Sequence, residues 1–260
     1  MDAREGSVRQ GGGDDAITTR LGAAALPLGV VVLVVAETLH PSREDPMDNP
    51  AVFAEYADSD IWTVVHLLEY FGFLLLLGGL VALYYSLKER PGVGAGLAPF
   101  GLAAAVTTAA SFTVLQAVDG IALKRAVDAW ASAPADREAV AFAAAEAIRW
   151  IEIAMNSLSY FLAGLTLFLY GFAIALGAVY PRWAGLIAMV SGAALMYNGV
   201  VEVAYEGFVP SIIKLVGLLL LAVWAFVMAF SMWRYGSRRR RVARPEPAPP
   251  GPTRRSANPR

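Results

Sequence analysis

The chain has 260 residues, of which 57% are hydrophobic and 17% are charged, and its formal net charge is −1. Soluble domains typically carry about a quarter of charged residues, so this composition points to a protein embedded in lipid. Cysteine is absent, which excludes disulfides, thiolate metal sites and cysteine nucleophiles.

The first apolar run, residues 21–39, predicts a membrane-spanning helix that Pro41 terminates. Residues 1–20 before it are glycine-rich and polar, which predicts a disordered N-terminal arm. The run also fits a cleaved signal peptide, because residues 34–36 (Val-Val-Ala) offer a small-residue cleavage site. The long arm, which holds acids as well as bases, favours the membrane span.

The second and third spans follow a loop. The loop, His40–Asp60, holds three prolines and ends in a short helical piece. The second span is predicted over residues 61–87. The third, residues 93–118, is rich in small residues that allow close helix packing. Residues 119–136 then predict an exposed helical segment, because charged residues alternate with apolar ones.

No strong helix breaker occurs between residues 137 and 176. A helix of this length would measure about 60 Å, whereas the hydrocarbon core is about 30 Å thick. The fourth span is therefore predicted over residues 153–176, with the preceding turns outside the bilayer. The fifth and sixth spans are predicted over residues 183–203 and 211–233.

The C-terminal tail, residues 236–260, is predicted to be disordered and basic. Nine arginines follow Trp233, against one acid. If both termini are cytoplasmic, 15 lysines and arginines lie inside and 6 outside, which agrees with the positive-inside rule. The predicted fold is an all-α, polytopic six-helix transmembrane bundle over residues 21–235, with cytoplasmic termini and helical extensions on the outer side.

Polar residues at membrane depth gather in the outer halves of these spans. Glu69 lies about 12 Å deep in the second span, and the polar residues of the fourth span recur at spacings of 3 or 4, which puts them on one face. Ionisable residues in a membrane span mark a functional site, so we expect an outward-facing pocket that binds or transports a small molecule, an ion or a lipid. The expected lining is His66, Glu69, Gln116, Arg149, Glu152, Asn156, Asn198 and Glu202, with Glu37, His40, Tyr70, Tyr160 and Lys214 as secondary members.

Two other interpretations remain open. The charged residues could pair with one another and only hold the bundle together. Alternatively, the outer helices, residues 119–152, could dock a membrane partner through Trp130 in a structural or regulatory subunit. A second copy of the chain is a further partner left open.

Metal or haem chemistry is the weakest interpretation. His40 and His66 could ligate a haem, or a zinc ion together with nearby acids. No zinc-binding spacing supports this, and no P-loop, dinucleotide-binding or nucleophile-elbow motif occurs. The sequence therefore predicts no cofactor and no metal, and identifies no catalytic residue. The basic tail predicts contact with anionic lipid rather than nucleic acid.

A weak internal repeat occurs at an offset of 90 residues. Tyr70 and Phe71 correspond to Tyr160 and Phe161, and Pro91 corresponds to Pro181. His66 then corresponds to Asn156, which predicts that these two side chains face each other across the pocket.

Three segments carry a resemblance to a known family. They are HPSREDPMDNPAVFAEYADSD (residues 40–60), VLQAVDGIALKRAVDAWASAP (residues 114–134) and EAIRWIE (residues 146–152). Together they resemble a group of bacterial multi-pass membrane proteins built on a domain of unknown function, the DUF4386 family. The resemblance implies about six helices and a bacterial plasma (inner) membrane, and it transfers no activity.

Overall fold

The computed structural model describes residues 3–204, 207–208 and 211–243, and every regular element in this part of the chain is a helix. The elements are α1 (Ala3–Leu39), α2 (Asn49–Ala57), α3 (Trp62–Lys88), α4 (Val93–Ala117), the π-helical turn η1 (Val118–Leu123), α5 (Lys124–Ala131), α6 (Glu138–Ala175), α7 (Arg182–Ala204) and α8 (Ile212–Ala243). Helix α2 lies in the proline-rich loop. Its start is fixed by the Asp48 side chain, which accepts a hydrogen bond from the Ala51 amide.

Six of the described helices are long and apolar enough to cross a membrane. They are α1 from Asp15, α3, α4 together with η1 and α5, α6, α7, and α8 up to Arg238. Large apolar side chains on the bundle surface, such as Phe71, Val190 and Phe230, are more than half exposed. Such a surface suits lipid rather than water. The predicted six apolar helices are confirmed, and they support a multi-pass membrane protein in contact with a bilayer.

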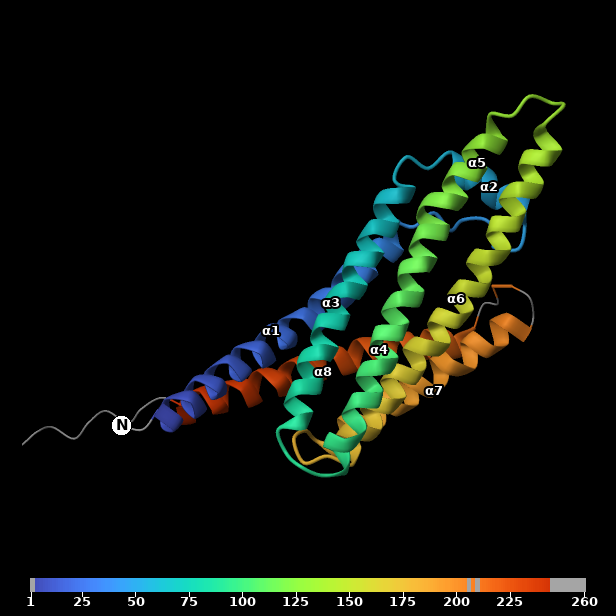
Figure 1. Ribbon diagram of the computed structural model, residues 1–260. Helices are drawn as coiled ribbons and strands as arrows, with labels where there is room; N and C mark the ends of the chain where they lie inside the picture. Colours follow the sequence, from blue (N-terminus) through green and yellow to red (C-terminus); the bar gives the residue numbers. More distant parts are fainter. Residues whose placement is uncertain (1–2, 205–206, 209–210, 244–260) are drawn as a thin grey trace, which may run out of the picture.

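The six long helices form a closed ring. Its order is α1, α3, α4, α6, α7 and α8, and α8 packs against α1 to complete it. Neighbours in the ring run antiparallel (Figure 1). Buried apolar side chains from all six helices form one cluster that includes Leu26, Leu83, Tyr170, Leu195 and Trp224. The ring therefore has a packed core.

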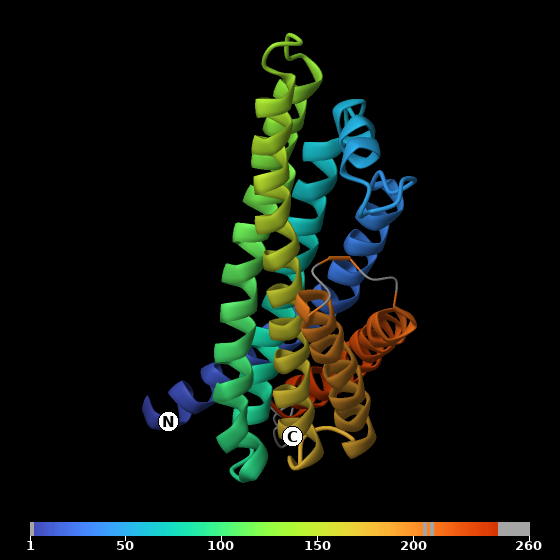
Figure 2. The ribbon, with the colours of Figure 1, turned by 90° about the vertical axis from the view of Figure 1, so that its right-hand side faces the viewer.

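The two ends of the bundle differ in their elements. At one end, which we call the polar end, α1 ends, α3 and α6 begin, and α4 continues into η1 and α5 (Figure 1). Figure 2 shows that α5 and the first turns of α6 rise beyond the other long helices there. Phe53 of α2, Trp130 of α5 and Phe142 of α6 form an aromatic cluster with ring centroids 5.5–6.1 Å apart. This cluster fixes α2 on the protruding helices.

Glycines set the spacing between α6 and α7. A β-carbon on Gly164 would lie 2.5 Å from the carbonyl oxygen of Gly192, and one on Gly171 would lie 2.7 Å from that of Gly185. A β-carbon on Gly199 would lie 2.5 Å from the carbonyl oxygen of Ser157. The contacts recur every seven residues along both helices. Small residues at such an interface let two membrane helices approach closely.

The first helix extends further than predicted. The sequence predicts a disordered arm over residues 1–20, but α1 begins at Ala3. Ala16 is fully buried, and the Arg20 guanidinium lies 4.1 Å from the centroid of a Trp233 ring on α8. The end of this arm is helical because α8 gives it a surface to pack on.

The last helix likewise enters the predicted tail. Helix α8 continues to Ala243, whereas the sequence predicts disorder over residues 236–260. A β-carbon on Gly236 would lie 3.1 Å from the Ala16 carbonyl oxygen, so α8 is closely packed on α1 at this point. Residues 244–260 lie outside the described residues.

The segment after the third predicted span is packed more closely than expected. The sequence predicts an exposed helical segment over residues 119–136. In the structure α4 runs through η1 into α5, and Leu123 and Val127 are fully buried. These two side chains join the apolar cluster that contains residues of α2 and α6. The segment is amphipathic, and its apolar face is covered.

We expect Gly164→Ala to destabilise the protein, by about 1–3 kcal/mol, because the new methyl group would meet the backbone of α7. Gly78→Ala is the matched control, since a β-carbon there has no neighbour within 4 Å. It should leave stability unchanged or raise it by up to about 1 kcal/mol through helix propensity. Thermal unfolding in detergent compares the two. Equal stability of both variants would contradict the close glycine packing.

Candidate functional site

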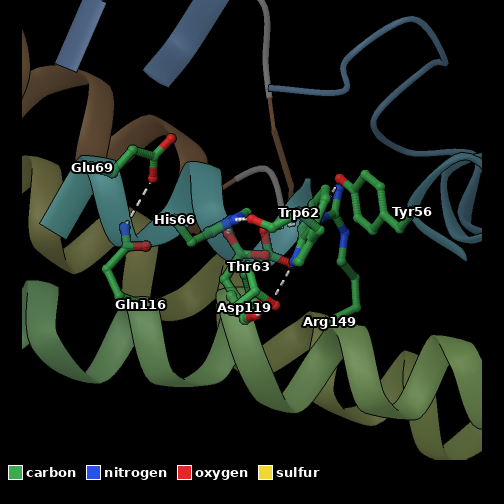
Figure 3. A network of polar contacts seen from close by, with 10 residues as sticks. Tyr56, Trp62, Thr63, His66, Glu69, Gln116, Asp119 and Arg149 are labelled. Carbon is green, nitrogen blue, oxygen red and sulfur yellow. Dashed lines mark hydrogen bonds and ion pairs between the residues drawn. The ribbon is translucent and has the colours of Figure 1, made fainter. Parts of the chain in front are cut away.

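Polar side chains of α3 and the α4–η1 segment meet at the polar end (Figure 3). The Nε2 atom of His66 lies 3.1 Å from Oδ2 of Asp119, and its Nδ1 atom lies 2.8 Å from the carbonyl oxygen of Trp62. Less than one turn further along α3, the Gln116 side chain donates a hydrogen bond of 3.0 Å to Glu69. His66 is only 2% exposed. We call His66, Asp119, Glu69 and Gln116 the histidine network.

The π-helical turn places Asp119 opposite His66. The indole N–H of Trp62 donates to the carbonyl of Asp119 at 3.0 Å, and the Thr63 hydroxyl donates to the carbonyl of Gly120 at 3.1 Å. A β-carbon on Gly120 would lie 2.6 Å from Cβ of His66, so glycine permits this close approach. Single π-turns are frequent at functional sites. Here the backbone of the turn accepts hydrogen bonds from Trp62 and Thr63, and its Asp119 carboxylate faces the His66 imidazole.

A buried ion pair adjoins the histidine network. Arg149 and Glu152 of α6 are separated by 2.7 Å, and their side chains are 2% and 4% exposed. Arg149 also donates to the Tyr56 hydroxyl at 3.1 Å and to the Pro46 carbonyl at 3.1 Å. Burial raises the pKa of Tyr56, so its phenol is neutral at physiological pH. Arg149 thus ties α6 to α2 and to the loop before it.

The loop between α1 and α2 is held by Glu55. This buried carboxylate accepts hydrogen bonds from the Arg43 amide, the Arg43 side chain and the Glu44 amide, at 3.1–3.2 Å. Burial alone would raise the pKa of Glu55. The hydrogen bonds and the charge of Arg43 lower this pKa by more than burial raises it, so it lies below its ordinary value. Beside this loop lies a hollow of about 550 Å³. Its wall includes His40, Arg43, Glu55, Asp58 and Asp60.

Carboxylates outnumber permanent cations around His66. Asp119, Glu69 and Glu152 all interact electrostatically with its imidazole. Among the residues described in this region, Arg149 is the permanent cation that interacts with these acids, and it is paired with Glu152. This end of the protein therefore has an acidic interior.

A second polar network lies between α6, α7 and α8. Glu202 is fully buried, and it accepts hydrogen bonds from Lys214 and from the Asn156 side chain, both at 3.2 Å. The Lys214 ammonium also lies 4.4 Å from the centroid of the Tyr160 ring. The negative charge of Glu202 is balanced by the positive charge of Lys214. We call this set the lysine network.

The structure thus divides the predicted pocket between separate networks. His66, Glu69 and Gln116 belong to the histidine network, Arg149 and Glu152 form the adjoining ion pair, and Asn156, Glu202, Tyr160 and Lys214 belong to the lysine network. That His66 and Asn156 face each other across a pocket stays a prediction: His66 interacts with Trp62 and Asp119, whereas Asn156 donates to Glu202. A single pocket that all these residues line stays a prediction.

Four other predicted residues lie outside both networks and the ion pair. Asn198 is fully buried, and neither its amide nitrogen nor its amide oxygen has a hydrogen-bond partner. Glu37 is exposed near the end of α1, and Tyr70 is half-buried with its ring next to that of Phe71. The His40 ring lies 5.0 Å from Trp62 and 5.2 Å from His66, measured between centroids. His40 is therefore next to the histidine network.

Sequence reasoning missed three residues that build this end: Asp119, Trp62 and Tyr56. Asp119 falls in a segment that the sequence predicts to be exposed, and a π-turn has no clear sequence signature. The adjacent Gly120 was the available signal, since a glycine within a helix often marks a close approach.

A haem between the two histidines does not fit this arrangement. Centroids only 5.2 Å apart leave no room for a porphyrin plane and two iron–nitrogen bonds between the His40 and His66 rings.

Comparisons with protein-family models, with curated proteins and with solved structures found no match to this chain. Membership of the DUF4386 family therefore stays a prediction.

We expect Arg149→Met to cost about 3–5 kcal/mol, because it leaves the buried Glu152 carboxylate without a cation. Adding Glu152→Leu removes that carboxylate, so the double variant should be more stable than the single one. Asp128→Asn is the control, since the Lys124–Asp128 pair is much more exposed and its loss should cost about 0–1 kcal/mol. Unfolding in detergent measures all three. A single variant no worse than the control would show that the buried pair contributes little.

Proposed function

We propose that the chain is a multi-pass protein of a bacterial plasma membrane whose polar end faces the outside and binds a small cation there. The observation that carries this proposal is the charge of the interior at the polar end. Asp119, Glu69 and Glu152 surround His66, and Arg149 neutralises one of them. With His66 counted as a cation, one negative charge remains, and His40 is the other basic group beside these acids.

Buried carboxylates are unfavourable without a positive partner. In the lysine network the acid has its base, Glu202 with Lys214, and a purely structural role accounts for it. The acids around His66 lack an equal number of permanent cations within the described residues. A small cation would supply the missing charge, so the two networks support different roles.

The hollow beside the α1–α2 loop supports access from the water at the polar end. Its wall includes three acids, Glu55, Asp58 and Asp60, against one base, Arg43. A recess lined by acids raises the local concentration of cations. His40 belongs to this wall and also contacts the ring of His66. The hollow and the histidine network are thus neighbours through His40.

The distribution of lysine and arginine supports the orientation. With the polar end outside, 15 of these residues lie on the cytoplasmic side or in the terminal segments and 6 on the outside. The end of α8 contributes Arg234 and Arg238 to the cytoplasmic side. The basic tail would there meet anionic lipid.

Docking of a partner through the outer helices is the second candidate function. The predicted anchor, Trp130, is half-buried and packs on Phe53 and Phe142 within the same chain. That contact uses the indole to hold α2 in place. The structure favours no partner on this face, so cation binding is the better-supported function.

Cation binding predicts a specific rise in the unfolding temperature. Purified protein in detergent is heated in sodium, calcium, zinc or choline chloride at matched ionic strength. At least one of the three metal ions should stabilise the protein more than choline does, by about 2.7 kcal/mol when it is present at 100 times its dissociation constant. The variants Asp119→Asn and Glu69→Gln should reduce this difference, whereas Asp128→Asn, on the exposed face of α5, should retain it. Identical unfolding in all four salts would end the proposal.

Orientation can be tested separately, because the chain has no native cysteine. Ala135→Cys places a thiol in the exposed loop between α5 and α6, and Pro91→Cys places one in the exposed loop between α3 and α4. In intact cells a membrane-impermeant maleimide should label the first variant only. Permeabilised cells should show labelling of both. The reverse pattern in intact cells would place the polar end in the cytoplasm.

A further inference from the structure

Three potential metal ligands converge at the polar end. One ligand atom each from His40, His66 and Asp119 lies within 4.8 Å of the other two. The three residues come from separate parts of the chain: the residue just after α1, the first turns of α3 and the turn η1. They are brought together only by the fold.

The hydrogen bonds of His66 leave one ring nitrogen for a further cation. A carbonyl oxygen only accepts, so the Nδ1 atom, 2.8 Å from the Trp62 carbonyl, carries a proton. The Nε2 atom lies 3.1 Å from Oδ2 of Asp119, but the pair is not aligned as a hydrogen bond, and Nε2 is buried without a hydrogen-bond partner. Oδ1 of Asp119 is also buried and without one. A nitrogen and a carboxylate facing each other in this way are stabilised by a positive charge between them, which either a proton on Nε2 or a metal ion supplies.

The surroundings of His66 and Asp119 match those of metal ligands. A metal-bound imidazole usually donates its other N–H to a carbonyl or a carboxylate, which fixes the tautomer and the ring. Trp62 does this for His66, and its indole N–H also holds the backbone of Asp119. One residue therefore orients two of the three ligands.

The ligand types select the class of metal. Imidazole nitrogen and carboxylate oxygen together suit zinc and neighbouring transition metals, whereas calcium and magnesium prefer oxygen alone. Two histidines and one carboxylate leave a fourth position open, as in catalytic zinc sites. His40, which is half-buried, lines the acidic hollow and so gives the site contact with the outside.

From these observations we propose that His40, His66 and Asp119 bind a divalent transition metal of the zinc class. The proposal rests on the cation-binding function proposed above and names the ion and its ligands. Sequence reasoning predicted no metal because the ligands are far apart in the chain and Asp119 was not among the candidates.

The test uses the full chain in detergent, purified with a histidine-free tag and stripped with a chelator. The chain holds only these two histidines, so an imidazole-bound metal reports on this site. Zinc is titrated against a chromophoric chelator, and cobalt(II) is added to a parallel sample. We expect one zinc per chain and a cobalt absorption band of the intensity typical of a four-coordinate site with nitrogen ligands.

Single variants then assign the ligands. His40→Ala, His66→Gln and Asp119→Asn should each weaken zinc binding by at least about 10- to 100-fold, since even the loss of an outer partner of a ligand has an effect of that size. Asp60→Asn is the matched control: it removes an acid from the same hollow but not from the ligand set, and it should bind zinc like the unchanged protein. His40 lies just beyond the end of α1, so its variant keeps the test valid if His66→Gln fails to fold.

Two results would overturn the metal proposal. One is the absence of stoichiometric zinc binding, and the other is unchanged binding in both His40→Ala and Asp119→Asn. Stabilisation by sodium or calcium that survives in His40→Ala would leave the general cation-binding function standing while this proposal fails. Unchanged unfolding in all salts, zinc included, would remove both.

Discussion

The structure depends on one constraint: a polar group inside a lipid-embedded bundle must find its partner within the protein, because hydrocarbon offers none. Arg149 with Glu152, Lys214 with Glu202, and the amide nitrogen of Gln116 with Glu69 form such pairs. The same constraint makes an unmatched group informative. The buried amide of Asn198 on α7 is one departure from the rule. The Nε2 atom of His66, which faces Asp119 without an aligned hydrogen bond, and the excess of acids around it are departures that occur together, near the hollow beside the α1–α2 loop.

The helices were predictable because their signal is local. Long apolar runs and the breaks at Pro41, Pro91 and Pro181 depend only on neighbouring residues, and the structure has its six long helices where these runs lie. The helical state of residues 3–20 and 236–243 was not predictable in this way. Their helices pack against each other, so each depends on a partner more than 200 positions away in the sequence.

The site was predictable in part for the same reason. Glu69, His66 and Arg149 stand out because an ionisable residue in an apolar helix is rare. Their partners do not stand out: Asp119 lies in a charged segment, and Tyr56 and Pro46 lie in a loop. Sequence also merged two networks into one pocket, since it gives the depth of a residue in the membrane but not the neighbour that its helix faces. The closed order of the ring decides that, and it puts α3 beside α4 but α7 beside α8.

The glycine contacts between α6 and α7 repeat with a period of seven residues, so they do not by themselves define a unique alignment of the two helices. Sliding α7 by one period would bring Gly164 opposite Gly185, with equally small residues in contact. That alignment would move the start of α7 back along α6 by about 10 Å, so it would need a longer connection than the one at residues 176–181. The short turn at Pro181 is therefore what selects a single registry from several that the interface would accept.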